Sequence, residues 1–248
     1  MPSMPTVPDV RVVTIDFGPL PLARTLNPRL STDRSLLLAT LDVAWTPVDP
    51  IAAVARLEER LLAFLPGFAD HECRGAERYH VFAQAGRNRR PATPGGPAYS
   101  CTSFEPTLAL AHLIEHAVID FECAILDGRR CSGVTAAHRS PPGRYDLMVE
   151  CADPRVGRCC LAMAMAWLTA AAQGRELGPA EREVLAAARL AYRRGGQALW
   201  PPGVARALSW PEPHARRALA ALRDLGFLSE SAYTVNLSGL PEYRLGRS

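Results

Sequence analysis

Residues 111–122, AHLIEHAVIDFE, decide how the chain is interpreted. His112 and His116 are four residues apart, and Glu115 lies between them. At about 100° per residue, both imidazoles lie on one helix face with the carboxylate beside them. Most other residues of the stretch are apolar, which predicts a buried helix from about residue 107 to 126. Buried histidines and a buried glutamate need a partner that satisfies their polar atoms.

A zinc ion is such a partner. Two neutral imidazoles one helical turn apart can bind one Zn²⁺, and a neighbouring carboxylate can deprotonate the metal-bound water. The spacing HxxEH is the inverted form of the HExxH motif of metallopeptidases. We therefore predict zinc ligands at His112 and His116 and a general base at Glu115. The competing interpretation is an apolar helix whose polar residues have only a structural role.

A hydrolytic zinc site needs a third protein ligand and an open position. The candidates are Glu150, Asp120 and the thiols Cys151 and Cys123. Glu150 is preferred because it ends the apolar stretch YDLMVE, where a carboxylate is otherwise out of place. On a strand, Glu150 and Cys151 face opposite sides, so only one of them can reach the metal. Asp120 is expected to support a metal-binding histidine by a hydrogen bond.

The pattern around this helix predicts an α+β fold. Helices are expected at 50–65 and 154–172, and strands at 10–17, 36–45, 77–84, 130–138 and 144–152. Residues 86–100 form a loop rich in arginine, proline and glycine. This order predicts a first domain, residues 1–174, with a largely antiparallel sheet and helices on one side.

Residues 175–248 are predicted to form a second domain. Helices at 179–196, 201–210 and 212–228, followed by an alternating segment at 231–245, give the outline of a winged helix. Arginines 216, 217 and 223 fall on the presumed recognition helix, where they would contact DNA phosphates. From residue 176 onward there are ten arginines and seven acids, a smaller excess than DNA-binding domains usually have. Docking of a peptide, or dimerisation, is therefore preferred to DNA binding.

Composition narrows the function classes. The net charge of +3 is too small to indicate nucleic acid or an anionic membrane. No signal peptide or apolar run long enough to span a bilayer is present, which predicts a cytoplasmic protein with no membrane partner. The cysteines lack a CxxC pair, so we expect reduced, mostly buried thiols and no cysteine-rich zinc site. They are Cys73, Cys101, Cys123, Cys131, Cys151, Cys159 and Cys160.

Three segments resemble the N-terminal domain of cyanophycin synthetases: LLAFLPGFADHEC at 61–73, LAHLIEHAVIDFE at 110–122 and PPGRYDLMVECADPRVGR at 141–158. The likeness covers about residues 15–174. In some members this domain is a zinc hydrolase of the HxxEH type, and a metallohydrolase fold similar to LuxS or M16 proteins is one form expected for the α+β domain. The resemblance implies metallopeptidase roles for His112, Glu115, His116 and Glu150. The ATP-dependent ligase domains of the family have no counterpart here, so no ligase activity is implied.

The segment SGVTAAHRS at 132–140 departs from the glycine- and arginine-rich sequence usual in that family. We expect His138 to assist catalysis by donating to a tetrahedral intermediate, and Arg139 to contact the substrate. Because this segment differs, the expected substrate is another peptide or an amino-acid conjugate rather than cyanophycin.

The sequence thus predicts a zinc-dependent peptidase or amidohydrolase. Its winged helix would present a peptide, such as a carrier from which the product is released, or join two subunits into a homodimer. One alternative is a DNA-binding regulator whose N-terminal domain senses a metal or ligand. Another is a module that binds a polymer or peptide without turning it over.

Overall fold

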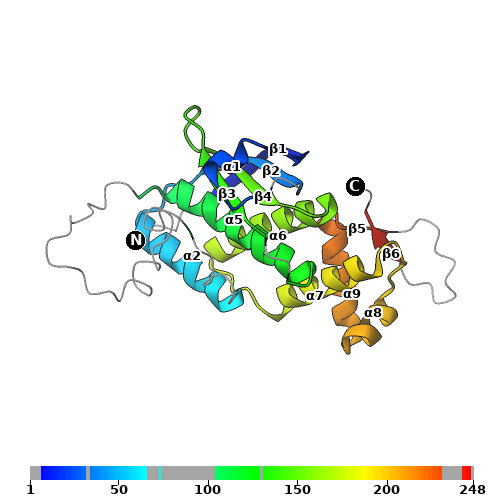
Figure 1. Ribbon diagram of the computed structural model, residues 1–248. Helices are drawn as coiled ribbons and strands as arrows, with labels where there is room; N and C mark the ends of the chain where they lie inside the picture. Colours follow the sequence, from blue (N-terminus) through cyan, green and yellow to red (C-terminus); the bar gives the residue numbers. More distant parts are fainter. Residues whose placement is uncertain are drawn as a thin grey trace, which may run out of the picture.

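The computed structural model describes residues 7–31, 34–65, 73, 104–128, 131–230 and 242–246. It confirms the α+β class, with a four-stranded antiparallel sheet in the order β1-β2-β4-β3 (Figure 1). The strands are β1 (Asp9–Gly18), β2 (Leu36–Ala44), β3 (Gly133–Ala137) and β4 (Arg144–Glu150). The predicted strand at 77–84, the loop at 86–100 and residues 231–241 lie outside the described residues.

The two faces of the sheet are set by the alternation of residues along each strand. On β4, Tyr145, Leu147 and Val149 are buried in the main core, together with the side chains of the helices. Met148 points to the opposite face, where it packs with a smaller apolar cluster that includes Leu36. We call the first side the helix face of the sheet and the second side the outer face.

Helices α2 (Pro50–Phe64), α5 (Pro106–Ile125) and α6 (Pro154–Ala172) lie on the helix face (Figure 1). Of these, α5 contacts strands β2, β3 and β4 directly. The short helix α1 (Ala23–Leu26) lies on the outer face, where Ala23 packs in the smaller cluster. The sheet and the helices around α5 therefore form the layer that positions the HxxEH residues.

The N-terminus of α5 is tied to β4 by side chains. The Tyr145 hydroxyl donates to Glu105 Oε1 at 2.7 Å and lies 2.7 Å from the Thr107 hydroxyl. Glu105 is the residue that precedes the first turn of α5, and its own side chain makes no capping hydrogen bond. The buried tyrosine thus fixes the start of the helix that carries both histidines.

The C-terminal elements continue the same core. They are α7 (Pro179–Arg194), α8 (Pro201–Leu208), α9 (Glu212–Asp224), β5 (Leu228–Glu230) and β6 (Tyr243–Leu245). Strands β5 and β6 pair antiparallel, and Leu199 bridges to Tyr243. Helix α7 packs against α5, and the buried residues on both sides of residue 174 form one continuous cluster. Among the described helices, none has the length and apolar character required to cross a membrane.

Candidate metal centre

Helix α5 presents its polar residues inside the protein. His112, Glu115 and His116 are 7%, 3% and 3% exposed. The two imidazole rings meet edge to face, with their centroids 4.4 Å apart. The sequence therefore placed both histidines correctly on one buried face of a helix.

The third donor near the histidines is Cys73. Its Sγ lies 3.3 Å from His112 Nε2 and 3.0 Å from His116 Nε2. One ligand atom from each of the three residues lies within 4.8 Å of the others, the only such group of three among the described residues. Donors that share one tetrahedral zinc ion at its usual bond lengths are about 3.3–3.8 Å apart. The spacing of this group therefore fits a single metal ion with little adjustment.

Glu115 lies on the far side of the His112 ring from Cys73. Its Oε2 is 3.1 Å from His112 Nδ1, and the Thr135 hydroxyl donates to the same oxygen. The neighbouring Gly133 makes room for this carboxylate, because a Cβ there would lie only 2.7 Å from Glu115 Oε1. A carboxylate on Nδ1 fixes the tautomer and the orientation of a histidine that binds metal through Nε2.

This position differs from the one predicted for a general base. A base must lie within about 3 Å of the water from which it takes a proton. Glu115 instead reaches the ring nitrogen that points away from the other two donors. Glu115 therefore lies where it can orient the His112 ring, and not where a general base for metal-bound water would be expected.

The charge state of His112 follows from its surroundings. Burial by itself lowers the pKa of the imidazole, but the Glu115 carboxylate and the Cys73 sulfur outweigh burial and raise the pKa to about 9. The ring is therefore protonated at neutral pH in the metal-free protein. Metal binding must displace that proton, as is general for histidine ligands.

Glu150, the predicted third ligand, does not join the histidines. It shares the outer face of β4 with Met148, whereas α5 covers the helix face. Its Oε1 accepts a hydrogen bond from the Ser31 amide at 2.6 Å, and its Oε2 accepts one from Arg34 at 3.0 Å. The prediction that Glu150, and not Cys151, faces the histidines was therefore wrong about the side of the strand. The Glu150 carboxylate instead anchors the segment that follows α1.

The other candidate ligands do not belong to this group of donors. Asp120 is half-buried on the next turn of α5, and its support of a metal-binding histidine stays a prediction. Cys151 lies on the helix face, but its thiol donates to the Asp153 carbonyl at 3.2 Å. Cys123 lies near Cys131, whose thiol donates to Glu122 Oε2 at 3.6 Å. These thiols surround Glu122 rather than the histidines of the metal centre.

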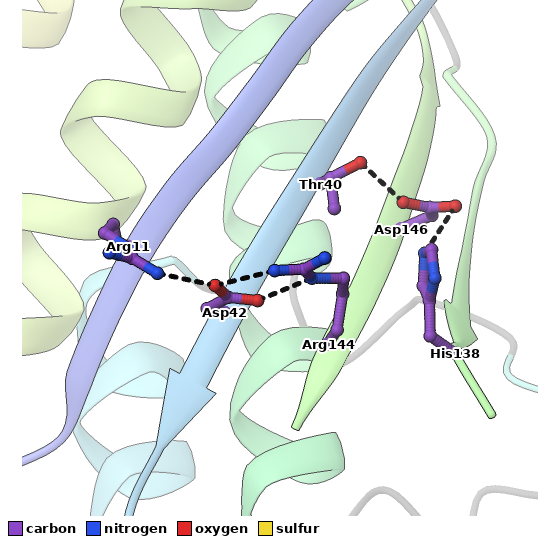
Figure 2. Close-up of polar contacts among 6 residues, drawn as sticks. All are labelled: Arg11, Thr40, Asp42, His138, Arg144 and Asp146. Atoms are coloured by element: carbon purple, nitrogen blue, oxygen red, sulfur yellow. Dashed lines mark hydrogen bonds and ion pairs between the residues drawn. The ribbon is translucent and has the colours of Figure 1, made fainter. Parts of the chain in front are cut away.

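His138 and Arg139 are also separated from the metal centre. His138 pairs with Asp146 on the outer face, with Nε2 and Oδ2 3.0 Å apart, and the Thr40 hydroxyl donates to the other carboxylate oxygen at 2.7 Å (Figure 2). Arg139 is exposed in the turn between β3 and β4. The sheet lies between His138 and α5, and Arg139 lies in a turn beyond the strands. The catalytic role predicted for His138 and the substrate contact predicted for Arg139 therefore do not follow from this geometry.

Cys73 was missed because an isolated cysteine 39 residues before His112 carries no spacing pattern. A local signal was nevertheless present. Cys73 ends the sequence DHEC at 70–73, in which every residue type can bind a metal. This segment follows the Pro-Gly break after the first predicted helix, a place where loop residues can approach another element.

The sequence matches no protein-family model and no curated protein. The resemblance to the N-terminal domain of cyanophycin synthetases therefore stays a prediction. The geometry of the site is what points to a function.

Proposed function

We propose that the protein is a zinc-dependent hydrolase whose metal is held by Cys73, His112 and His116. The convergence of their three donor atoms carries this proposal. A thiol with two imidazoles suits Zn²⁺, whereas Mg²⁺ and Ca²⁺ prefer oxygen ligands. Catalytic zinc sites generally use three protein ligands and structural sites four. When bound, zinc polarises a scissile carbonyl and lowers the pKa of a water molecule to about 7.

The residues of the chain would prepare this site in two steps. Thr135 fixes the Glu115 carboxylate, and Glu115 in turn holds the His112 ring with Nε2 directed at Cys73. The apolar surroundings of α5 keep competing water away from both imidazoles. The expected substrates are peptides or amino-acid conjugates, as the HxxEH spacing suggests.

We further propose that the predicted second domain, residues 175–248, is a winged helix that docks a peptide or protein. In support, the order is α7, the Leu199 bridge, α8, α9 and then the β5–β6 pair. Trp200, the residue that precedes α8, is 41% exposed, which suits protein contact. The arginines of α9 are engaged by acids, since Arg216 pairs with Glu212 at 2.6 Å and Arg223 with Glu230 at 3.2 Å. This neutralisation favours protein docking over DNA binding.

Metal analysis tests the metal centre. We expect about one zinc per chain in wild type, and loss of zinc in Cys73→Ser and His116→Ala. Cys123→Ser and His138→Ala are matched controls, because they remove a half-buried thiol and an imidazole outside the site. Wild type that takes up no zinc, or Cys73→Ser with undiminished zinc affinity, would contradict the assignment.

A hydrolysis screen tests the chemistry. Zinc-loaded protein would be incubated with a panel of dipeptides, N-acyl amino acids and isopeptides, with and without a chelator. We expect turnover that the chelator and His116→Ala abolish and that Glu150→Gln preserves. Bound zinc without turnover of any member of the panel would favour the non-catalytic binding module. Retarded migration of DNA, lost in Arg216→Ala, would favour the regulator.

A further inference from the structure

Strand β1 forms an edge of the sheet that has no partner strand among the described residues. Nine of its ten residues pair with β2 on one side, and Figure 1 shows β1 at the margin of the sheet. Long exposed edges with free backbone groups readily pair with another chain. The opposite edge, β3, has only five residues, and its Gly133 carbonyl accepts a hydrogen bond from the Asn27 side chain at 2.7 Å.

The helix face of β1 carries an incompletely buried apolar strip. Val10, Val12, Ile15 and Phe17 lie beside core residues of β2. The four β1 side chains are only half-buried, although their neighbours on β2 are between 0% and 5% exposed. The strip therefore extends beyond the helices that cover the rest of the sheet, and further burial would stabilise it.

We infer that β1 pairs antiparallel with β1 of a second copy of this chain, about a twofold axis between Val13 and Thr14. In this register Val12 lies opposite the partner's Ile15, and Val10 lies opposite the partner's Phe17. Both pairs lie on the helix face. The half-buried strips of the two copies thus cover one another in one continuous eight-stranded sheet.

The charges on the outer face select the same register. Arg11 lies opposite the partner's Asp16, and the symmetry repeats this pair. Arg11 uses one nitrogen to bind Asp42 at 2.8 Å (Figure 2). Its side chain is 75% exposed. A guanidinium has five N–H donors, so it can bind a second carboxylate. Asp16 is exposed and forms no ion pair with any residue that the structure describes.

Neighbouring registers bring together like charges or residues of opposite faces. β1 has a bulge, because its pairing with β2 shifts between Val12 and Thr14. The alternation of its side chains between the two faces of the sheet is therefore interrupted at Val13. Sliding the partner by two residues in one direction places Asp9 opposite the partner's Asp16, which repels. Sliding it by two in the other direction places Thr14, an outer-face residue, opposite the partner's Ile15 on the helix face. A slip of one residue exchanges the faces altogether.

Site-directed cross-linking of the full chain tests this register. Opposite residues of an antiparallel pair have Cβ atoms about 4.5–5.5 Å apart, within reach of a disulfide after small adjustment. We expect Arg11→Cys mixed with Asp16→Cys to give a covalent dimer on mild oxidation, with the 11–16 peptide pair identified by mass spectrometry. Each single variant alone should give no dimer through its new cysteine, because the two equivalent positions lie about 17 Å apart along the strand.

Sedimentation provides an independent measurement. The sedimenting species of the wild type should have twice the chain mass of 26.9 kDa. Val13→Glu should sediment as a monomer, because the substitution places two carboxylates near the twofold axis of the dimer. Val7→Glu is the matched control, because Val7 is similarly exposed, at 47% against 41%, but precedes the strand. A monomeric wild type, as expected if another segment of the same chain covers this edge, overturns the inference. So does a dimer that lacks the 11–16 cross-link.

Discussion

Glu115 can approach His112 because Gly133, the strand residue beside the Glu115 carboxylate, has no side chain. A Cβ on Gly133 would lie 2.7 Å from Glu115 Oε1 and 3.1 Å from Ile119 Cδ1. We predict that Gly133→Ala displaces the carboxylate and lowers zinc affinity about 10- to 100-fold, the usual effect of losing a partner of a metal ligand. Overpacking should also cost about 1–3 kcal/mol of stability.

Competition with a zinc-binding dye measures this affinity, and urea unfolding measures the stability. Gly196→Ala is the control, because a Cβ there meets nothing within 4 Å. Unchanged zinc affinity in Gly133→Ala would show that Glu115 does not position His112.

Glu122 predicts a pH dependence of stability. Burial raises the pKa of the Glu122 carboxyl from 4.5 to about 8. Hydrogen bonds with Cys151 and Cys131 oppose this rise in the pKa, and the nearby Cys123 and Glu150 add to it. The folded protein therefore keeps a proton that the unfolded chain releases above pH 4.5. This stabilising contribution is complete below pH 4.5 and is lost as the pH rises to about 8. The native state should weaken by a few kcal/mol at most over that window, at about 1.4 kcal/mol per pKa unit.

Denaturant unfolding of wild type and Glu122→Gln at pH 5 and pH 8 isolates this contribution, because every other titrating group is common to both proteins. The free energy of unfolding of the variant should depend less on pH. Equal pH slopes for the two proteins would mean that Glu122 is ionised in the folded state.

The residues of the candidate metal centre show which features of a site can be predicted from sequence and which cannot. The pair His112 and His116 follows from helical periodicity, which is a local property of the chain. The third donor depends on how a distant segment packs, so Cys73 could not be chosen by spacing. Glu150 is different, because the alternation along β4 already places it with Met148 and away from buried Val149.

At the level of elements, helix starts are the best-predicted feature because they are encoded locally. Helices α2 and α6 each begin with an Asp-Pro pair, in which the aspartate accepts a backbone hydrogen bond and the proline occupies the first turn. The predicted span 154–172 of α6 agrees with the structure. Strand pairing is less local, and the order β1-β2-β4-β3 could not be derived from the strands themselves.

The capping residue of α2 gives an element-scale prediction. Asp49 Oδ1 accepts a hydrogen bond from the Ala52 amide at 2.9 Å. Asp49→Ala should lower the free energy of unfolding by about 1 kcal/mol, because it leaves that amide without its cap. Asp9→Ala, at an exposed strand end, is the control and should be nearly neutral. Equal effects of the two substitutions in urea unfolding would contradict a specific role for the cap.

For the whole molecule, the sequence suggests two domains because its character changes near residue 174. The structure shows that burial continues across this point, since α7 packs on α5 and both contribute to one core. A change in composition reports what a segment contains, whereas contacts between segments depend on surfaces that only the folded chain brings together. The helix that carries the histidines is therefore supported by the C-terminal half as well as by the sheet.

This shared core predicts that zinc stabilises both halves together. Zinc at 100 times its dissociation constant should add about 2.7 kcal/mol to any unit whose unfolding releases it. If α5 and α7 unfold as one unit, calorimetry should show one transition that moves upward with zinc, and exchange of the slowest α7 amides should slow as much as that of the slowest α5 amides. His116→Ala should abolish both effects. Two transitions, or zinc protection confined to residues 104–128, would show that the halves unfold independently in spite of their contact.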